Sequence, residues 1–120
     1  MAATIDATIK GENANSYVTL TEANDYFDTS PDSSTWTNKT DDQKKRSLIS
    51  AARWIDTLVF YGDRCDDGQA LKFPRNNYQV DGVELSCSII PNNIKLWSSK
   101  TSSIIGGVFS LRYNKTKLHY

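Results

Sequence analysis

Few side chains in this 120-residue chain could carry out covalent chemistry. The single histidine, His119, lies next to the last residue. Two carboxylate pairs, Asp41-Asp42 and Asp66-Asp67, could act as acid and base, but the first is typical of a helix N-terminus and the second of a polar loop. The sequence has no His-x-x-x-His pair, phosphate-binding lysine loop, glycine-rich dinucleotide turn or Gly-x-Ser-x-Gly elbow. It therefore predicts a protein that is not an enzyme and uses no metal or cofactor.

Two cysteines, Cys65 and Cys87, stand far apart in the sequence, with no Cys-x-x-Cys motif and no nearby histidine. This pattern indicates neither a zinc site nor a redox pair, so we expect both thiols to be reduced. The sequence also has no apolar run long enough for a membrane helix, and its first residues do not resemble a signal peptide. We therefore expect the chain to remain in the cytoplasm where it is made, without a membrane partner.

Charge is divided unevenly along the chain, although the formal net charge is zero. Residues 1–84 carry all 14 acidic side chains and nine of the 14 basic ones, a net charge of −5. Residues 85–120 carry the other five basic side chains, a net charge of +5. Such a division predicts a basic tail that meets nucleic acid, or one that docks on the acidic body of a neighbouring copy. A solvated tail without a partner is the third interpretation.

Nucleic-acid binding has limited support in the sequence. Proteins that bind single strands combine a basic groove with stacking aromatic side chains, and Tyr113 and Tyr120 lie among the basic residues of the tail. The same aromatic residues at strand spacing would equally suit packing, and an isoelectric point near 6.5 does not favour strong affinity for phosphates. The candidates to face DNA are Lys44, Lys45, Lys115 and Lys117.

The strongest local pattern predicts a central helix from Thr40 to Gly62. Thr40 and Gln43 can form a capping box at its start, and Gly62 can end it. Apolar residues recur at steps of three and four and form one buried stripe: Leu48, Ala51, Ala52, Ile55, Leu58 and Val59.

Shorter elements flank this helix. A first helix is predicted to start after Thr19 or Thr21, with Glu22 in a position to close a capping box on Thr19. Trp36 in the following polar loop should fold back onto the body. Asp81-Gly82 predicts a tight β-hairpin turn. Pro91 marks the start of a last helix that the diglycine at 106–107 would stop. Its predicted apolar face is Ile94, Trp97, Thr101, Ile104 and Ile105.

These elements predict a mainly α fold, a small bundle of three to four helices with a short β-hairpin and extended N- and C-terminal arms. We divide the chain into an N-terminal arm (1–16), a helical domain (17–105) and a basic C-terminal arm (106–120). Burying the three apolar side chains of residues 108–115 would stabilise that segment by roughly 5 to 9 kcal/mol, whereas ordering its backbone costs on the order of 8 to 16 kcal/mol. We therefore expect residues 106–120 to be mobile until a partner orders them, and we expect the same of Ile5 to Lys10 at the other end of the chain. The residues predicted to contact a neighbouring subunit or another partner are Phe109, Leu111, Arg112, Tyr113, Arg75, Ile5 and Ile9.

Five short stretches in fixed order resemble one protein family over about residues 13 to 97. They are Asn15-Ser16-Tyr17-Val18, Ala51-Ala52-Arg53-Trp54-Ile55-Asp56, Gln69-Ala70-Leu71-Lys72-Phe73-Pro74-Arg75, Asp81-Gly82 and Ile90-Pro91-Asn92-Asn93-Ile94-Lys95. The sequence is similar to phage head-to-tail connector (adaptor) proteins, a family also known as DnaT-like single-stranded DNA-binding proteins.

The resemblance implies a structural subunit of the virion neck that is made in the host cytoplasm. Such a subunit would assemble into a ring, expected to have twelve copies to match the portal, between the portal protein and a tail or neck completion protein. Double-stranded DNA would pass through the lumen of the ring. The alternative functions are a single-stranded DNA-binding accessory protein and, more distantly, a small regulatory binding protein. The serine-rich segment 98–103 departs from the alanine-rich and leucine-rich last helix that the resemblance implies.

Overall fold

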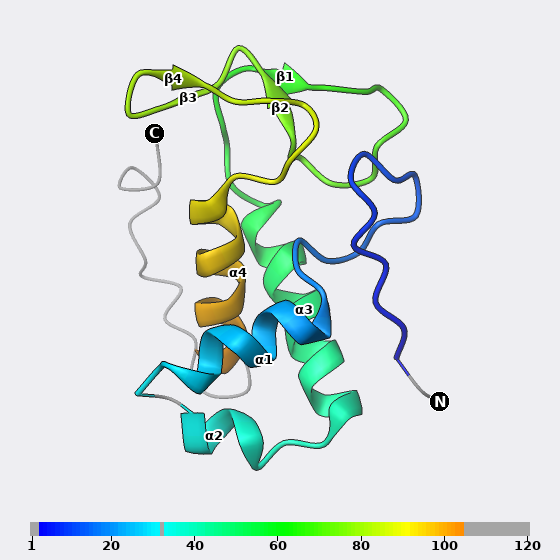
Figure 1. Ribbon diagram of the computed structural model, residues 1–120. Coiled ribbons are helices and arrows are strands. Elements are labelled where there is room, and N and C mark those ends of the chain that lie inside the picture. Colours follow the sequence, from blue (N-terminus) through cyan, green and yellow to red (C-terminus); the bar gives the residue numbers. More distant parts are fainter. Residues whose placement is uncertain (1–2, 32, 105–120) are drawn as a thin grey trace.

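The computed structural model describes residues 3–31 and 33–104, and these form a helical layer capped at one end by short strands and loops (Figure 1). The helices are α1 (Leu20–Asp28), α2 (Ser33–Thr37), α3 (Asp41–Ile55) and α4 (Asn92–Ile104). The strands are β1 (Asp63–Arg64), β2 (Arg75–Asn76), β3 (Gln79–Val80) and β4 (Val83–Glu84). This arrangement confirms the predicted small helical fold with a short β-hairpin. No helix within the described ranges is both long and apolar enough to cross a bilayer.

Both predicted capping boxes are present. The Thr19 hydroxyl accepts a hydrogen bond from the Glu22 backbone N–H at 3.1 Å, and the Glu22 carboxylate accepts one from the Thr19 N–H at 3.0 Å. Thr40 and Gln43 make the same reciprocal pair at the start of α3, at 3.2 and 2.9 Å. Each box satisfies two backbone donors that would otherwise lack a partner, and so fixes where its helix begins.

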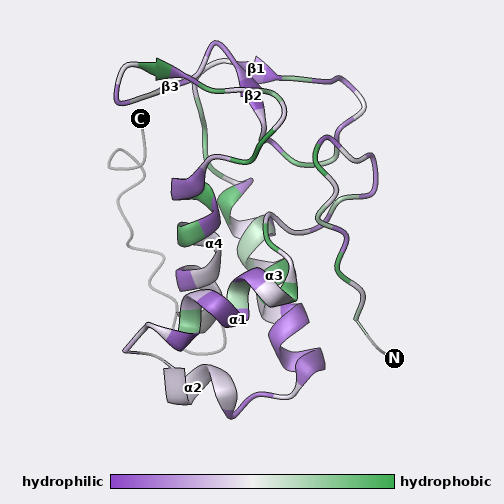
Figure 2. Cartoon of the chain, viewed as in Figure 1, coloured by the Kyte–Doolittle hydropathy of each residue, from purple (hydrophilic) through white to green (hydrophobic). Residues whose placement is uncertain are grey.

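The central helix is shorter than predicted, because α3 ends at Ile55 and not near Gly62. The next side chain, Asp56, turns away to bind groups from two distant segments, and Leu58 follows in a turn in which its N–H donates to the Ile55 carbonyl at 3.0 Å. Leu58 is buried as predicted, but Val59 is 72% exposed, so its assignment to the buried stripe is wrong. Figure 2 shows α3 as hydrophilic in its first turns and more hydrophobic towards its C-terminal end.

The last helix continues through the serine-rich segment and is described to Ile104. Ser98, Ser99, Thr101 and Ser102 are all buried where α4 packs against α3 and α1. Small side chains allow a close approach to α3, on which Ala51 and Ala52 are also buried, and this packing outweighs the poor helix propensity of serine. The Ser102 hydroxyl donates to the Ser99 carbonyl at 2.6 Å, which satisfies it within the helix.

The core has two parts that α3 joins. A larger cluster lies near the strands and a smaller one lies between α1, α2 and the start of α3. In the smaller cluster Trp36 is buried and stacks on Phe27 with ring centres 4.4 Å apart, and its indole N–H donates to Asn24 Oδ1 at 2.8 Å. The prediction that Trp36 folds back onto the body is therefore confirmed.

The N-terminal arm is extended but lies against the body, which differs from the expected mobile arm. Asn15 holds it in place: its side-chain amide donates to the Thr4 carbonyl at 2.9 Å, and its Oδ1 accepts from the Asp6 N–H at 2.8 Å. Ile5 packs against the smaller core cluster, while Ile9 remains exposed. The Ala70 N–H donates to the Gly11 carbonyl at 3.0 Å and the Ala3 N–H donates to Asp42 Oδ1 at 3.3 Å, so the arm is a folded part of the domain.

The strand region contains one expected and one unexpected sheet. The hairpin of β3 and β4 turns at Asp81 and Gly82, whose φ angles of 53° and 78° fit the predicted tight turn. The pairing of β1 with β2 was not predicted from the sequence. Gly62, with a φ of 78°, permits this pairing: a Cβ there would lie 2.0 Å from the Asn76 carbonyl oxygen.

Cys65 and Cys87 form a disulfide bond, so the expectation of reduced thiols is wrong. The bond joins the loop after β1 to the segment between β4 and α4. The sequence spacing could not indicate it, because the two cysteines meet only after the chain has folded back through both small sheets.

We predict that Leu58→Ala lowers the free energy of unfolding by about 2 to 5 kcal/mol, because it empties a buried site in the larger core cluster. Denaturant unfolding would measure the loss. Arg53→Ala, at an exposed position of α3, is the control and should change stability by less than about 0.5 kcal/mol. A loss below about 1 kcal/mol for Leu58→Ala would contradict its place in the core.

We also predict that reducing the disulfide lowers the free energy of unfolding by about 3 kcal/mol, since the bond closes a loop between positions 22 residues apart. Unfolding with and without dithiothreitol measures the effect. The double variant Cys65→Ala/Cys87→Ala should show the same loss and no response to the reductant. Equal stability of the oxidised and reduced wild type would contradict a stabilising bond.

Candidate functional site

Three of the sequence stretches that are similar to the known family meet at one buried cluster. The Tyr17 hydroxyl donates to Asp56 Oδ1 and accepts from the Phe73 N–H at 3.3 Å. The other carboxylate oxygen of Asp56 accepts from the Lys72 N–H at 3.2 Å. We call Tyr17, Asp56 and these two backbone groups the tyrosine latch. It fastens two segments to the end of α3: the segment before α1, and the irregular segment between β1 and β2 (residues 65–74), which we call the crossing.

Burial dominates the electrostatics of the latch. It raises the pKa of Asp56, and the hydrogen bonds from Tyr17 and the Lys72 N–H act in the opposite direction. Burial and the neighbouring charge of Asp56 raise the pKa of Tyr17 far above its usual value. The phenol therefore keeps its proton and serves as a fixed donor. This arrangement holds three segments of the chain together.

Gln69 closes a loop within the crossing. Its side-chain amide donates to the carbonyls of Leu71 at 2.8 Å and Pro74 at 3.0 Å, and its Oε1 accepts from the Asp66 N–H at 3.0 Å. The expected extended crossing contains a cis Phe73–Pro74 peptide. Phe73 is buried between Tyr17, Phe60 and Tyr78, which confirms it as an apolar anchor.

Arg75 is engaged within the chain. Its guanidinium donates to three backbone carbonyls: Tyr61 at 2.9 Å, Lys72 at 3.1 Å and Gly62 at 2.6 Å. The residue is only 8% exposed. Arg75 was predicted to contact a partner, and within the described residues its guanidinium binds carbonyls of its own chain.

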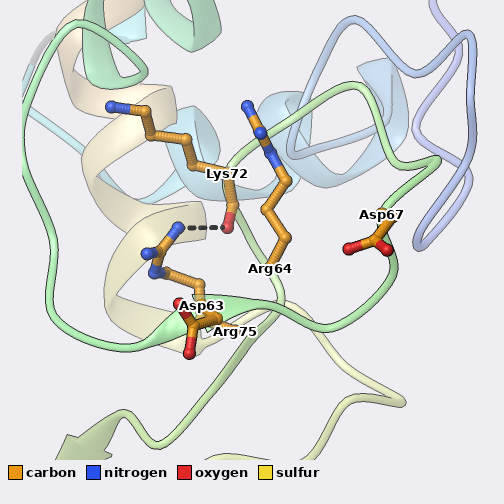
Figure 3. Close-up of a pocket in the computed structure, with 5 residues that line it drawn as sticks. All are labelled: Asp63, Arg64, Asp67, Lys72 and Arg75. Carbon is orange, nitrogen blue, oxygen red and sulfur yellow. Dashed lines mark hydrogen bonds between the residues drawn. The ribbon is translucent and has the colours of Figure 1, made fainter.

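A cleft of about 350 Å³ lies beside Arg75, between the strand β1 and the crossing (Figure 3). Lys72, in its wall, donates from Nζ to the Leu58 carbonyl at 2.5 Å. Arg64 is exposed, and the side chain of Tyr61, whose carbonyl binds Arg75, is 61% exposed. The residues that line the cleft are Asp63, Arg64, Asp67, Lys72 and Arg75.

This cleft can offer an anion one exposed guanidinium with an exposed aromatic residue close in sequence. Two carboxylates, Asp63 and Asp67, reduce its positive potential. The sequence reasoning missed Arg64 and Tyr61, because only the pairing of β1 with β2 brings them next to Arg75. Within the described ranges, no group of three or more potential ligands could hold a metal ion.

Of the four predicted DNA-facing residues, the structure describes Lys44 and Lys45. Lys44 and Lys45 lie in the first turns of α3, at the opposite end of the molecule from the cleft (Figure 1). The Lys44 amine lies 5.6 Å from the centre of the Trp36 ring, and its side chain is only 13% exposed. Lys45 is partly exposed. The predicted tail residues lie outside the described residues: Phe109, Leu111, Arg112, Tyr113, Lys115 and Lys117.

We predict that Tyr17→Phe lowers the free energy of unfolding by about 1 to 3 kcal/mol, because it leaves the buried Asp56 carboxylate without its side-chain donor. Chemical denaturation measures the loss. Tyr26→Phe is the matched control, since Tyr26 is partly exposed and its hydroxyl has no hydrogen bond among the described residues; its effect should stay below about 0.5 kcal/mol. Equal effects of the two substitutions would contradict the latch.

Comparison with known proteins gives one match. A family model described as "Putative DnaT-like ssDNA binding protein" matches residues 1–97, which include all five stretches described above. No curated protein and no solved structure matches the chain. The match confirms the DnaT-like part of the resemblance, whereas its description says nothing of a connector. The chain belongs to the family of DnaT-like ssDNA binding proteins.

Proposed function

We propose that this chain is a non-enzymatic structural subunit of a tailed phage particle, a head-to-tail connector that forms a ring between the portal and the tail proteins. The observation that carries the proposal is the disulfide bond between Cys65 and Cys87. Disulfides are rare in the reducing cytoplasm and persist on secreted proteins and virion surfaces. A replication accessory protein works in the cytoplasm, whereas a virion subunit leaves it, so the bond favours a protein of the particle.

The contacts made by residues of the five family-like stretches support the same proposal. Tyr17, Asp56, Gln69, Phe73 and Arg75 all bind other parts of the same chain, so the shared pattern specifies a fold and not a reactive site. Residues 1–104 carry 14 acidic and 11 basic side chains, a net charge of −3. A body with this charge attracts phosphates weakly, which suits a ring that DNA passes through without adhering.

Single-stranded DNA binding is the second candidate, and the family description supports it more directly than the connector. The cleft beside Arg75 supplies its specific observation. Arg64 could contact a phosphate and Tyr61 could stack on a base, which is the combination that single-strand binders use. Against it stand the two carboxylates in the same cleft and the negative charge of the body.

Fluorescence anisotropy with labelled oligonucleotides separates the two candidates. For a connector we expect dissociation constants weaker than about 10 μM at about 0.15 M salt, since few phosphates can be neutralised. Micromolar or tighter binding that falls steeply with salt, and that Arg64→Ala weakens while Arg53→Ala does not, would favour single-strand binding. Arg53 is a suitable control because it is also an exposed arginine.

Particles of the phage that encodes the chain provide the direct test of the connector. We expect mass spectrometry to detect the chain in purified particles, in a fixed ratio to the portal protein. Deleting its gene should give filled heads that lack tails. Particles that contain none of the chain, or tailed particles produced at normal yield without it, would contradict the proposal.

A further inference from the structure

A second cleft, of about 380 Å³, lies between α1 and α4, and we call it the α1–α4 groove. Its surface is partly apolar: Leu96 is 50% exposed, and the partly buried ring of Tyr26 lies on the α1 side. Across it, Lys95 Nζ lies 2.8 Å from Glu22 Oε2. Its lining includes Glu22, Asp25, Tyr26, Lys95 and Leu96.

The groove has an acidic rim. Glu22 and Asp25 are three residues apart on α1 and so lie on one side of the helix. Partial burial alone would raise the pKa of Glu22, but the hydrogen bonds from Lys95 and from the Thr19 N–H lower it, so the carboxylate stays ionised. The Lys95 ion pair compensates Glu22, whereas the exposed Asp25 has no ion pair among the described residues.

We propose that residues 108–117 of a second copy of this chain dock in the α1–α4 groove. In an extended segment Phe109, Leu111 and Tyr113 share one face, and the other face carries Arg112. The apolar face matches Leu96 and Tyr26. The segment contains three basic and no acidic side chains, which complements the acidic rim of the groove.

The proposed ring favours a second copy over the same chain, because a tail that fits a groove on a different surface makes a head-to-tail contact, and such contacts close into a ring when the rotation between copies allows it. The inference thus rests on the proposed ring and names the contact that would build it.

Sedimentation velocity of the full chain tests the contact through a charge exchange between Asp25 and Arg112. We expect the wild type to associate as its concentration rises, and Asp25→Lys or Arg112→Glu alone to weaken association by about tenfold or more. If the two effects were independent, the losses of affinity in the single variants would multiply in the double variant Asp25→Lys/Arg112→Glu. We expect the double variant to associate at least about tenfold more tightly than that. Glu84→Lys, the same charge change on exposed β4, should leave association within about twofold of the wild type.

Three outcomes would overturn the inference: a wild type that stays monomeric up to about 0.5 mM, losses that simply multiply in the double variant, or an effect of Glu84→Lys as large as that of Asp25→Lys. A monomeric chain whose tail becomes more sensitive to trypsin in Asp25→Lys would place its own tail in the groove, and would also overturn the second copy. Failure of the proposed function is recognised separately. A chain that associates through the groove but is absent from particles contradicts only the connector, and one present in particles but insensitive to the charge exchange contradicts only this inference.

Discussion

The buried hydrogen bond between Tyr17 and Asp56 is the constraint on which the rest of this structure depends. Asp56 stands where α3 ends, Tyr17 stands just before α1, and the backbone of Lys72 and Phe73 completes the same cluster. An ionised carboxylate in a largely apolar site is tolerated only if its oxygens have donors, so each of the three segments must be in place for the other two to be stable. The same hydrogen bonds fix the stretch that contains Lys72 and Phe73, although it has no regular secondary structure.

Features that depend on neighbouring residues could be predicted from the sequence. The two capping boxes, the Asp81-Gly82 hairpin and the burial of Trp36 are of this kind, because residue type and spacing alone determine them. The features that were missed involve distant partners. Asp56 at the end of α3 binds Tyr17, the serine-rich part of α4 packs on α3, and the disulfide joins two segments that the small sheets bring together. No local pattern contains that information.

The same distinction applies to the candidate site. Arg75 was predicted to contact a partner, whereas its guanidinium binds three carbonyls of its own chain, on segments whose proximity the sequence does not show. Lys44 was selected for its charge, and the structure places its amine over the Trp36 ring. Arg64 and Tyr61 carry no motif, and their place beside the cleft follows only from the pairing of β1 with β2. Charge and residue type identify candidates, whereas the tertiary pairings decide which of them share a surface.

The binding of Arg75 to three carbonyls has a mechanical consequence. The planar guanidinium fixes the direction of its hydrogen bonds to the carbonyls of Tyr61, Gly62 and Lys72. If one of these bonds breaks, the other two still hold the group in place, so the broken bond can form again. Because one side chain holds all three carbonyls, the backbone at Tyr61, Gly62 and Lys72 has little freedom left to lose when another molecule contacts it.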